Sequence, residues 1–169
     1  MDGDNLAISV RRARSTDAPA LARLVNRAYE VEQFFVDGDR TTADEIATLV
    51  ESQKGAFLVL EDIDRGSLAA AVYVDASWHP DKGGYIGMLS VDPELQGRGL
   101  GTRLVRIAEA MCEAMGAAWV GLKIINLREE LGRWYKALGY REVGTAPYAH
   151  RAVKQPCHFV EMRRELQAG

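Results

Sequence analysis

The sequence predicts a mixed α+β fold in one domain, with seven strands and four helices in the order β-α-α-β-β-β-α-β-α-β-β. Three observations predict it. Apolar runs of strand length alternate with longer segments in which apolar residues recur at helical spacing. Capping residues and glycine or proline turns separate these segments. The chain has 169 residues, 47% of them hydrophobic, and no repeat or second composition zone, so a single core is expected.

The first third of the chain is expected to form a strand followed by two helices. Residues 7–14 alternate apolar and polar side chains, and residues 15–19 supply a helix start with an acidic cap and a proline. Helical spacing continues to Tyr29, and residues 42–45 have the form of a capping box that opens a second helix. Residues 30–40 then form a connecting loop rich in aromatic and acidic side chains.

In the rest of the chain, turn residues mark the ends of the expected elements. A hairpin turn is expected at residues 62–66, and Gly83 and Gly84 are expected to form the next turn. Gly116 is expected to end the long central helix, and Asn126 to cap the last helix. The expected strands are 56–61, 68–75, 85–91, 118–124, 140–143 and 158–163, and the expected helices span about 98–115 and 126–138.

A glycine-rich turn joins a strand to a long helix at residues 96–102. Gly97, Gly99 and Gly101 let the backbone approach a ligand closely, so that several N–H groups can point at one anion. The positive N-terminal end of the helix adds to this attraction, which predicts a pyrophosphate site. The spacing is not that of the Rossmann fingerprint, and the Walker lysine is missing beside Thr102, so both nucleotide folds are excluded.

The turn resembles motif A of the GNAT superfamily, the acyl-CoA-dependent N-acyltransferases. Residues 96–101 read Gln-Gly-Arg-Gly-Leu-Gly and match the pattern Arg/Gln-x-x-Gly-x-Gly/Ala. Residues 126–140 resemble motif B, which ends in aromatic-Tyr-x-x-x-Gly-aromatic. The resemblance implies that residues 1–169 form one N-acetyltransferase domain, with a mostly antiparallel, splayed sheet of about seven strands flanked by four helices.

The resemblance implies acetyl-CoA as the co-substrate and no metal. The main chain of Leu89, Ser90 and Val91 would hold the pantetheine arm and the thioester carbonyl. Asn126 has two compatible interpretations, a helix cap and a contact with CoA. The pyrophosphate would lie on Gln96, Gly97, Arg98, Gly99, Leu100, Gly101 and Thr102, although Arg98 could equally be a solvated charge at a helix start.

The implied reaction transfers an acetyl group to a primary amine by direct attack in a ternary complex. Tyr135 falls where many relatives place a tyrosine that donates a proton to the departing CoA thiolate. A phenol suits this role because its ordinary pKa of about 10 is not far from that of a thiol, about 8.5. The alternative is that Tyr135 packs as an amphipathic aromatic residue.

The general base stays unassigned at this point. Relatives carry a glutamate or histidine at the position of Tyr85 or Gly87, and neither residue is a carboxylate or an imidazole. Tyr85 could hold a water chain, or an acid from the loop after the first helix could reach the amine. The candidate acids are Glu32, Asp37 and Asp39, and none of the three histidines, His79, His150 and His158, is favoured as a base.

The resemblance implies that the acceptor binds between residues 29–40 and residues 145–156. The first segment places Glu30, Glu32, Asp37 and Asp39 around Phe34 and Phe35, which would suit a cationic amine with an apolar portion. The second carries His150, Arg151 and Lys154, which could equally receive a carboxylate. A small-molecule amine is expected, with a protein lysine or N-terminal amine as the alternative acceptor. A non-catalytic acyl-CoA sensor is the alternative from another functional class.

Composition and charge indicate a cytoplasmic protein. The net charge of -3 and the pI of about 5.7 give no general reason to expect nucleic acid as a partner. The N-terminus carries Asp2 and Asp4 instead of a leader, and no apolar run is long enough to span a membrane. Cys112 and Cys157 are expected to be buried free thiols. Homodimers are common in the fold that the resemblance implies.

Overall fold

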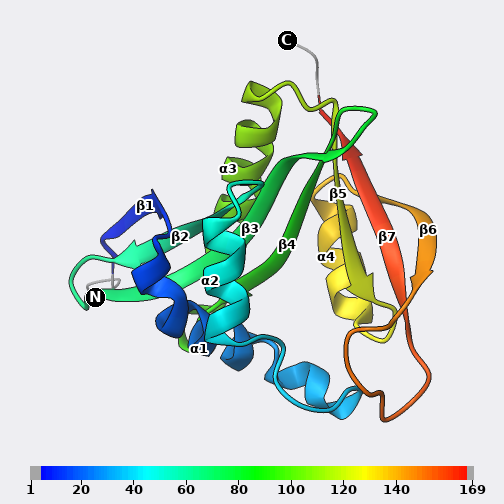
Figure 1. Cartoon of the computed structure of the whole chain (residues 1–169), viewed down its shortest axis with the longest axis horizontal. Coiled ribbons are helices and arrows are strands. Elements are labelled where there is room, and N and C mark those ends of the chain that lie inside the picture. Colours follow the sequence, from blue (N-terminus) through cyan, green and yellow to red (C-terminus); the bar gives the residue numbers. More distant parts are fainter. Residues whose placement is uncertain (1–4, 167–169) are drawn as a thin grey trace.

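A computed structural model describes residues 5–166, so Asp2 and Asp4 lie outside the described residues. A seven-stranded sheet in the order β1-β2-β3-β4-β5-β7-β6 carries helices on both faces (Figure 1). The predicted order of elements is confirmed, with three short 3-10 helices in addition. The strands are β1 (Ile8–Arg12), β2 (Ala56–Asp62), β3 (Ser67–His79), β4 (Gly83–Val91), β5 (Trp119–Ile125), β6 (Arg141–Pro147) and β7 (His158–Glu165). The helices are η1 (Ser15–Asp17), α1 (Ala18–Ala28), η2 (Glu30–Phe34), α2 (Ala43–Glu51), η3 (Pro93–Leu95), α3 (Leu100–Ala114) and α4 (Glu129–Ala137).

The sheet is splayed between β4 and β5, its one parallel pair within the described chain. These strands pair through Gly83 with Trp119, Gly84 with Val120, and Tyr85 with Gly121, and then separate. Figure 1 shows the two strands diverging from this point. Because β5 keeps its pairing with β7 along its whole length, the sheet continues on the far side of the split. The mostly antiparallel, splayed sheet that the resemblance implied is therefore present.

Gly83 and Gly84 do not form the expected turn; both lie in β4. The indole ring of Trp119 occupies the place that a Cβ at Gly83 would take, and the sulfur of Cys112 lies 2.8 Å from a Cβ built at Gly84. These glycines are therefore required by the close approach of β5 and α3 to the strand. The turn itself lies earlier, where Lys82 adopts a φ of +66°. The prediction of a turn at Gly83 and Gly84 was wrong because the packing of Trp119 and Cys112 against these glycines cannot be read from the local sequence.

Two apolar clusters cover the two faces of the sheet. One packs α1 and α2 against β2 and β3, through residues such as Leu21, Phe57 and Tyr73. The other packs α3 and α4 against the opposite face, through residues such as Leu104 and Tyr135. Cys112 is a buried free thiol as expected, whereas Cys157 is a free thiol that is only partly buried. Within residues 5–166 no helix is both long and apolar enough to cross a bilayer.

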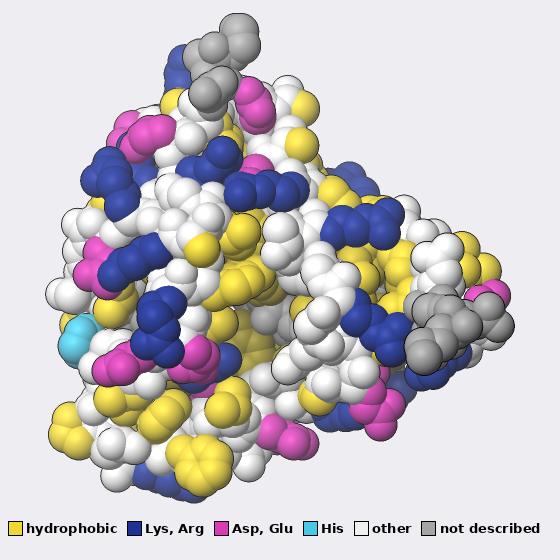
Figure 2. Space-filling model, turned by 180° about the vertical axis from the view of Figure 1, so that it is seen from behind, with side chains coloured by type: hydrophobic (Ala, Val, Ile, Leu, Met, Phe, Trp, Pro, Cys, Tyr) yellow, Lys and Arg dark blue, Asp and Glu magenta, His cyan; other side chains and the backbone are white. Residues whose placement is uncertain are grey.

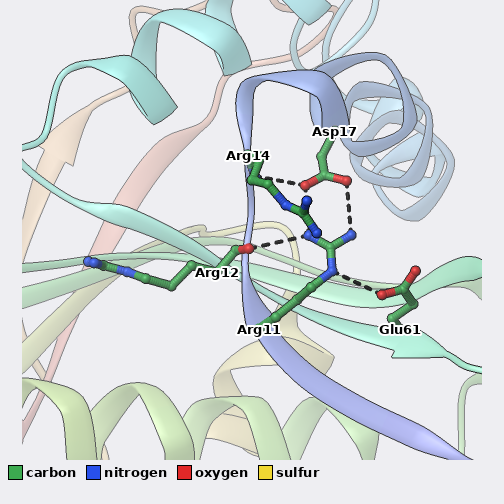
Figure 3. Close-up of polar contacts among 5 residues, drawn as sticks. All are labelled: Arg11, Arg12, Arg14, Asp17 and Glu61. Atoms are coloured by element: carbon green, nitrogen blue, oxygen red, sulfur yellow. Dashed lines mark hydrogen bonds and ion pairs between the residues drawn. The ribbon is translucent and has the colours of Figure 1, made fainter.

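Arg11 ties the edge strand β1 to the start of the first helix (Figure 3). Its guanidinium donates to the Asp17 carboxylate at 2.8 and 3.0 Å and to the Glu61 carboxylate on β2 at 2.9 Å. Asp17 also accepts the backbone N–H of Arg14 at 2.7 Å. One arginine thus joins β1, β2 and η1, and it fixes the direction in which the chain enters α1.

The Arg11–Asp17 pair predicts a loss of stability in acid. The hydrogen bond from Arg11 is the largest cause that holds the pKa of Asp17 below its ordinary value, and the Arg14 N–H acts in the same direction. A carboxyl whose pKa is lower in the folded state stabilises that state above about pH 4, and the contribution disappears as the pH falls through the folded value. The free energy of unfolding, measured in urea, should therefore fall more steeply below pH 4 for wild type than for Asp17→Asn. At pH 7 the variant should be less stable by about 1 kcal/mol. The exposed Asp64→Asn is the control, and parallel curves for wild type and Asp17→Asn would contradict the prediction.

Candidate active site

A cavity of about 400 Å³ opens where β4 and β5 separate. Its walls come from both strands, from the first turn of α3, from α4, and from the segments that follow α1 and β6. Figure 2 shows a hollow near the middle of the face opposite to that of Figure 1, with hydrophobic side chains in its depth and basic side chains around it. The cavity therefore reaches both layers of helices through the gap in the sheet.

A bulge in β4 shapes one wall of this cavity. Ser90 pairs with Ala71 and Gly87 pairs with Tyr73, so β4 has one residue more than β3 between these pairs. The bulge lies at Met88, which has a φ of +50°, and the Ser90 hydroxyl donates to the Met88 carbonyl at 2.9 Å. A bulge bends a strand and releases main-chain groups from the ladder. Leu89 and Val91 line the cavity beside it, whereas the Ser90 side chain is buried.

The glycine-rich turn forms a second wall. Six of its seven residues line the cavity, and Arg98 lies among them without lining it; the six are Gln96, Gly97, Gly99, Leu100, Gly101 and Thr102. Gly97 and Gly99 have φ of +81° and +79°, which side chains resist, and Gly99 is the N-cap of α3. The N–H groups of the first helical turn have no partner within the helix. The turn therefore presents free N–H groups and the positive end of a long helix to the cavity.

Tyr135 lines the cavity from α4 and is buried, with 5% of its surface exposed. Its ring packs edge-on against Trp134 and Tyr140, with centroids 4.8 and 5.5 Å away. Burial strongly raises the pKa of Tyr135, and the nearby phenols of Tyr29 and Tyr85 act in the same direction. The phenol is therefore protonated at neutral pH and can act as a proton donor.

The opposite wall carries polar groups from the end of α1 and from η2. Tyr29 and Arg40 line it, and the ring of Tyr85 stacks on Trp78 with centroids 4.6 Å apart. Glu32 is buried and forms ion pairs with Arg128 at 3.0 Å and with Arg151 at 3.5 Å. Burial raises the pKa of Glu32, and the two arginines oppose that shift only in part. Of the acids expected near the amine, Glu32 lies at the cavity.

The two segments expected to bind the acceptor lie against each other. The N–H of Asp37 donates to the Ala152 carbonyl at 2.8 Å, and that of Lys154 donates to the Phe35 carbonyl at 2.7 Å. This bridge turns Phe34 to solvent, with 76% of its surface exposed. The other expected residues on this segment, Phe35, Asp37 and Asp39, also lie away from the cavity lining. The bridge depends on pairing between residues about a hundred positions apart, which the local sequence does not encode.

Asn126 does not cap the last helix, so that interpretation was wrong. Helix α4 begins at Glu129, and its N-cap is Arg128. The Asn126 side-chain oxygen accepts the N–H of His158 at 2.8 Å, and its own N–H donates to the His158 carbonyl at 2.9 Å. Asn126 therefore closes the β5–β7 ladder, and its side-chain oxygen is used there instead of at the helix N-terminus. Its contact with CoA stays a prediction.

His150 lines the cavity, although no sequence pattern favoured it as a base. Its ring packs against Tyr148 and Phe159, with centroids 5.7 and 5.3 Å away. Burial lowers the pKa of His150, and the charges of Arg40 and Lys123 act in the same direction. Both effects favour the neutral imidazole. The signal available in the sequence was its place in the segment expected to bind the acceptor.

Comparison with known proteins identifies related folds. The model of the acetyltransferase (GNAT) family matches residues 19–140. The yncA protein of Salmonella typhimurium, whose structure contains acetyl-CoA, is 18% identical, with a TM-score of 0.75 over 96% of each chain. The ribosomal-protein-S18-alanine N-acetyltransferase of Escherichia coli is 18% identical, with a TM-score of 0.71 over 94% of this chain and 93% of the other. A GCN5-related N-acetyltransferase from Kribbella flavida is 21% identical, with a TM-score of 0.70 over 95% of this chain and 98% of the other. No curated protein sequence matches significantly.

The left-handed conformation of Gly99 generates a test of the glycine-rich turn. A Cβ at Gly99 would meet no atom within 4 Å, so Gly99→Val acts through backbone strain at φ +79° and through the N–H groups that this strain displaces. We expect the variant to weaken CoA binding at least about tenfold in calorimetry, as for the loss of hydrogen bonds to a charged group. Gly66→Val is the matched control because Gly66 also has a positive φ, +65°, with open space around it, and lies in the β2–β3 turn. Equal CoA affinity in both variants would contradict the assignment.

Proposed function

Because the chain belongs to the GNAT acetyltransferase family, we propose that it transfers the acetyl group of acetyl-CoA to the primary amine of a small molecule. One observation carries the proposal. A single cavity is lined by the N-terminal turn of α3, by the bulged strand β4, and by the buried phenol of Tyr135. Acyl transfer needs these three things: an anion site for the donor, free main-chain donors at the thioester, and a proton for the leaving group.

In the proposed complex, acetyl-CoA lies in the split between β4 and β5. Its pyrophosphate binds the N–H groups at residues 97–102, and its pantetheine arm follows the main chain of Leu89, Ser90 and Val91. Two observations support this placement: the unpaired edges of the two strands face the cavity, and the similar yncA protein holds acetyl-CoA. The bulge at Met88 supplies main-chain groups that can bind the thioester carbonyl.

The proposed reaction is a direct attack. The neutral amine attacks the carbonyl carbon of the thioester, a C–N bond forms, and the C–S bond breaks. Tyr135 gives its proton to the departing sulfur, and the amine nitrogen gives up a proton to a base. We place that base at His150, because its lowered pKa favours the neutral imidazole and its ring lines the cavity, whereas Glu32 is engaged by two arginines.

A small acceptor is favoured over a protein lysine. The bridge between Val36 and Val153, together with the Glu32–Arg151 ion pair, joins the two segments that border the acceptor side. A protein chain would need an open groove between these segments. A small amine requires only the cavity.

Replacing the phenol tests the proposed acid. Tyr135→Phe should lower kcat for thiol release from acetyl-CoA with an amine panel by about a hundredfold or more, without a change in CoA affinity, since proton donation to the sulfur is lost. Tyr140→Phe is the matched control, because the Tyr140 hydroxyl donates to Glu109 at 3.0 Å instead of facing the cavity. Normal turnover by Tyr135→Phe would contradict the role. Tight acetyl-CoA binding by wild type with no turnover of any amine would favour an acyl-CoA sensor.

The pH profile tests the proposed base. A histidine with a lowered pKa accepts a proton from the amine only above that pKa, so kcat/KM should show an acid step below pH 6.5, separate from the step at higher pH that belongs to the ammonium group of the acceptor. His150→Gln should remove that step and lower kcat by about a hundredfold. His158→Gln should keep the wild-type profile, because His158 does not line the cavity. Persistence of the acid step in His150→Gln would place the base elsewhere.

A further inference from the structure

Among the side chains that line the cavity, positive charges outnumber negative charges. Three permanent cations, Arg40, Lys123 and Arg128, line the cavity, against one carboxylate, Glu32. The acids Glu30, Asp37 and Asp39, which suggested a cationic acceptor, lie outside the lining. The charge of this site therefore suits an acceptor that carries an anion.

Of the two arginines that line the cavity, Arg40 is the one without an ion pair in residues 5–166. Glu32 is held by Arg128 at 3.0 Å and by Arg151 at 3.5 Å, and Arg128 also pairs with Glu130. Arg40 forms no ion pair with any carboxylate of residues 5–166; its guanidinium lies over the ring of Tyr29, 5.6 Å from the centroid. Lys123 is likewise without an ion pair in that part of the chain, but its side chain is exposed at the rim and contacts Phe159.

Arg40 lies with the groups of the acceptor side. Its positive charge acts to lower the pKa of four groups around the cavity, which are Tyr29, Tyr85, Glu32 and His150. Tyr85 is near the start of β4, whereas the glycine-rich turn follows its end at Val91, at most about 20 Å farther along the strand. Arg40 is therefore poorly placed to bind the pyrophosphate of the donor, and no ion pair within residues 5–166 engages its guanidinium, so it can bind an anionic group of the acceptor.

We propose that the acceptor is an amine bearing a carboxylate close to its nitrogen, as in a free α-amino acid, and that Arg40 binds this carboxylate. This inference rests on the proposed acetyltransferase function. A guanidinium presents two parallel N–H donors that match the two oxygens of a carboxylate. Lys123 adds positive potential at the rim, which attracts an anionic group. The amine nitrogen, one carbon from the carboxylate, then faces His150 and the thioester.

Matched acceptors test the proposal with the full-length protein and saturating acetyl-CoA. The acceptors are a panel of α-amino acids. Each one is compared with its carboxamide and with the amine that lacks the carboxyl group. We expect kcat/KM to be at least about tenfold higher for the amino acid of the preferred series. Arg40→Gln should raise KM for that amino acid about 10- to 100-fold, with little change in kcat or in KM for the carboxamide. Arg40→Lys should restore part of the loss, because it keeps the charge without the planar fork.

The control and the contrary outcomes separate this inference from the proposed function. Arg23→Gln removes an exposed arginine from α1 and should leave both acceptors unaffected. Equal use of amino acids and carboxamides, or an unchanged KM in Arg40→Gln, would overturn the carboxylate assignment and leave the acetyltransferase standing. Binding of CoA without acetylation of any amine would overturn both.

Discussion

The separation of β4 from β5 is the constraint on which the rest of the structure depends. Backbone N–H and C=O groups that leave a sheet must find other partners, because an unpaired buried group costs about 1–3 kcal/mol. Here the parallel pairing ends at Tyr85 and Gly121, and β4 carries a bulge at Met88 just beyond this point. The indole of Trp119 packs over Gly83 and fixes the two strands where they still pair. The result is a sheet whose middle is open to a ligand.

Electrostatic contacts then close the open sheet on its acceptor side. Glu32 is buried, and removing a carboxylate from water is costly unless cations compensate. Arg128 at the start of α4 and Arg151 between β6 and β7 provide that compensation at 3.0 and 3.5 Å. One carboxylate on η2 therefore holds together three segments that are far apart in the sequence. Because Glu32 pairs with Arg128 and Arg151, Arg40 has no ion pair with a carboxylate of residues 5–166.

The features that depend on local chemistry could be predicted from the sequence. The glycine-rich turn at residues 96–102 follows from backbone conformation alone, and periodicity and capping gave the order of all seven strands and four helices. The failures depend on distant partners. Gly83 is explained by Trp119, and Asn126 by the main chain of His158. The place of His150 in the cavity depends on how the β6–β7 segment folds back onto residues 35–37, which no local pattern specifies.

In the proposed complex, the partly apolar cavity also affects the protonation of the acceptor. An ammonium group that leaves water loses hydration, and nearby cations disfavour its charge further, so both effects lower the pKa of the bound amine. Arg40 and Lys123 act in this direction, while a carboxylate on the acceptor offsets part of their charge. A strongly cationic amine would meet the same cations without that offset. In the proposed complex, the charge that selects a carboxylate therefore also helps to generate the neutral nitrogen that the attack requires.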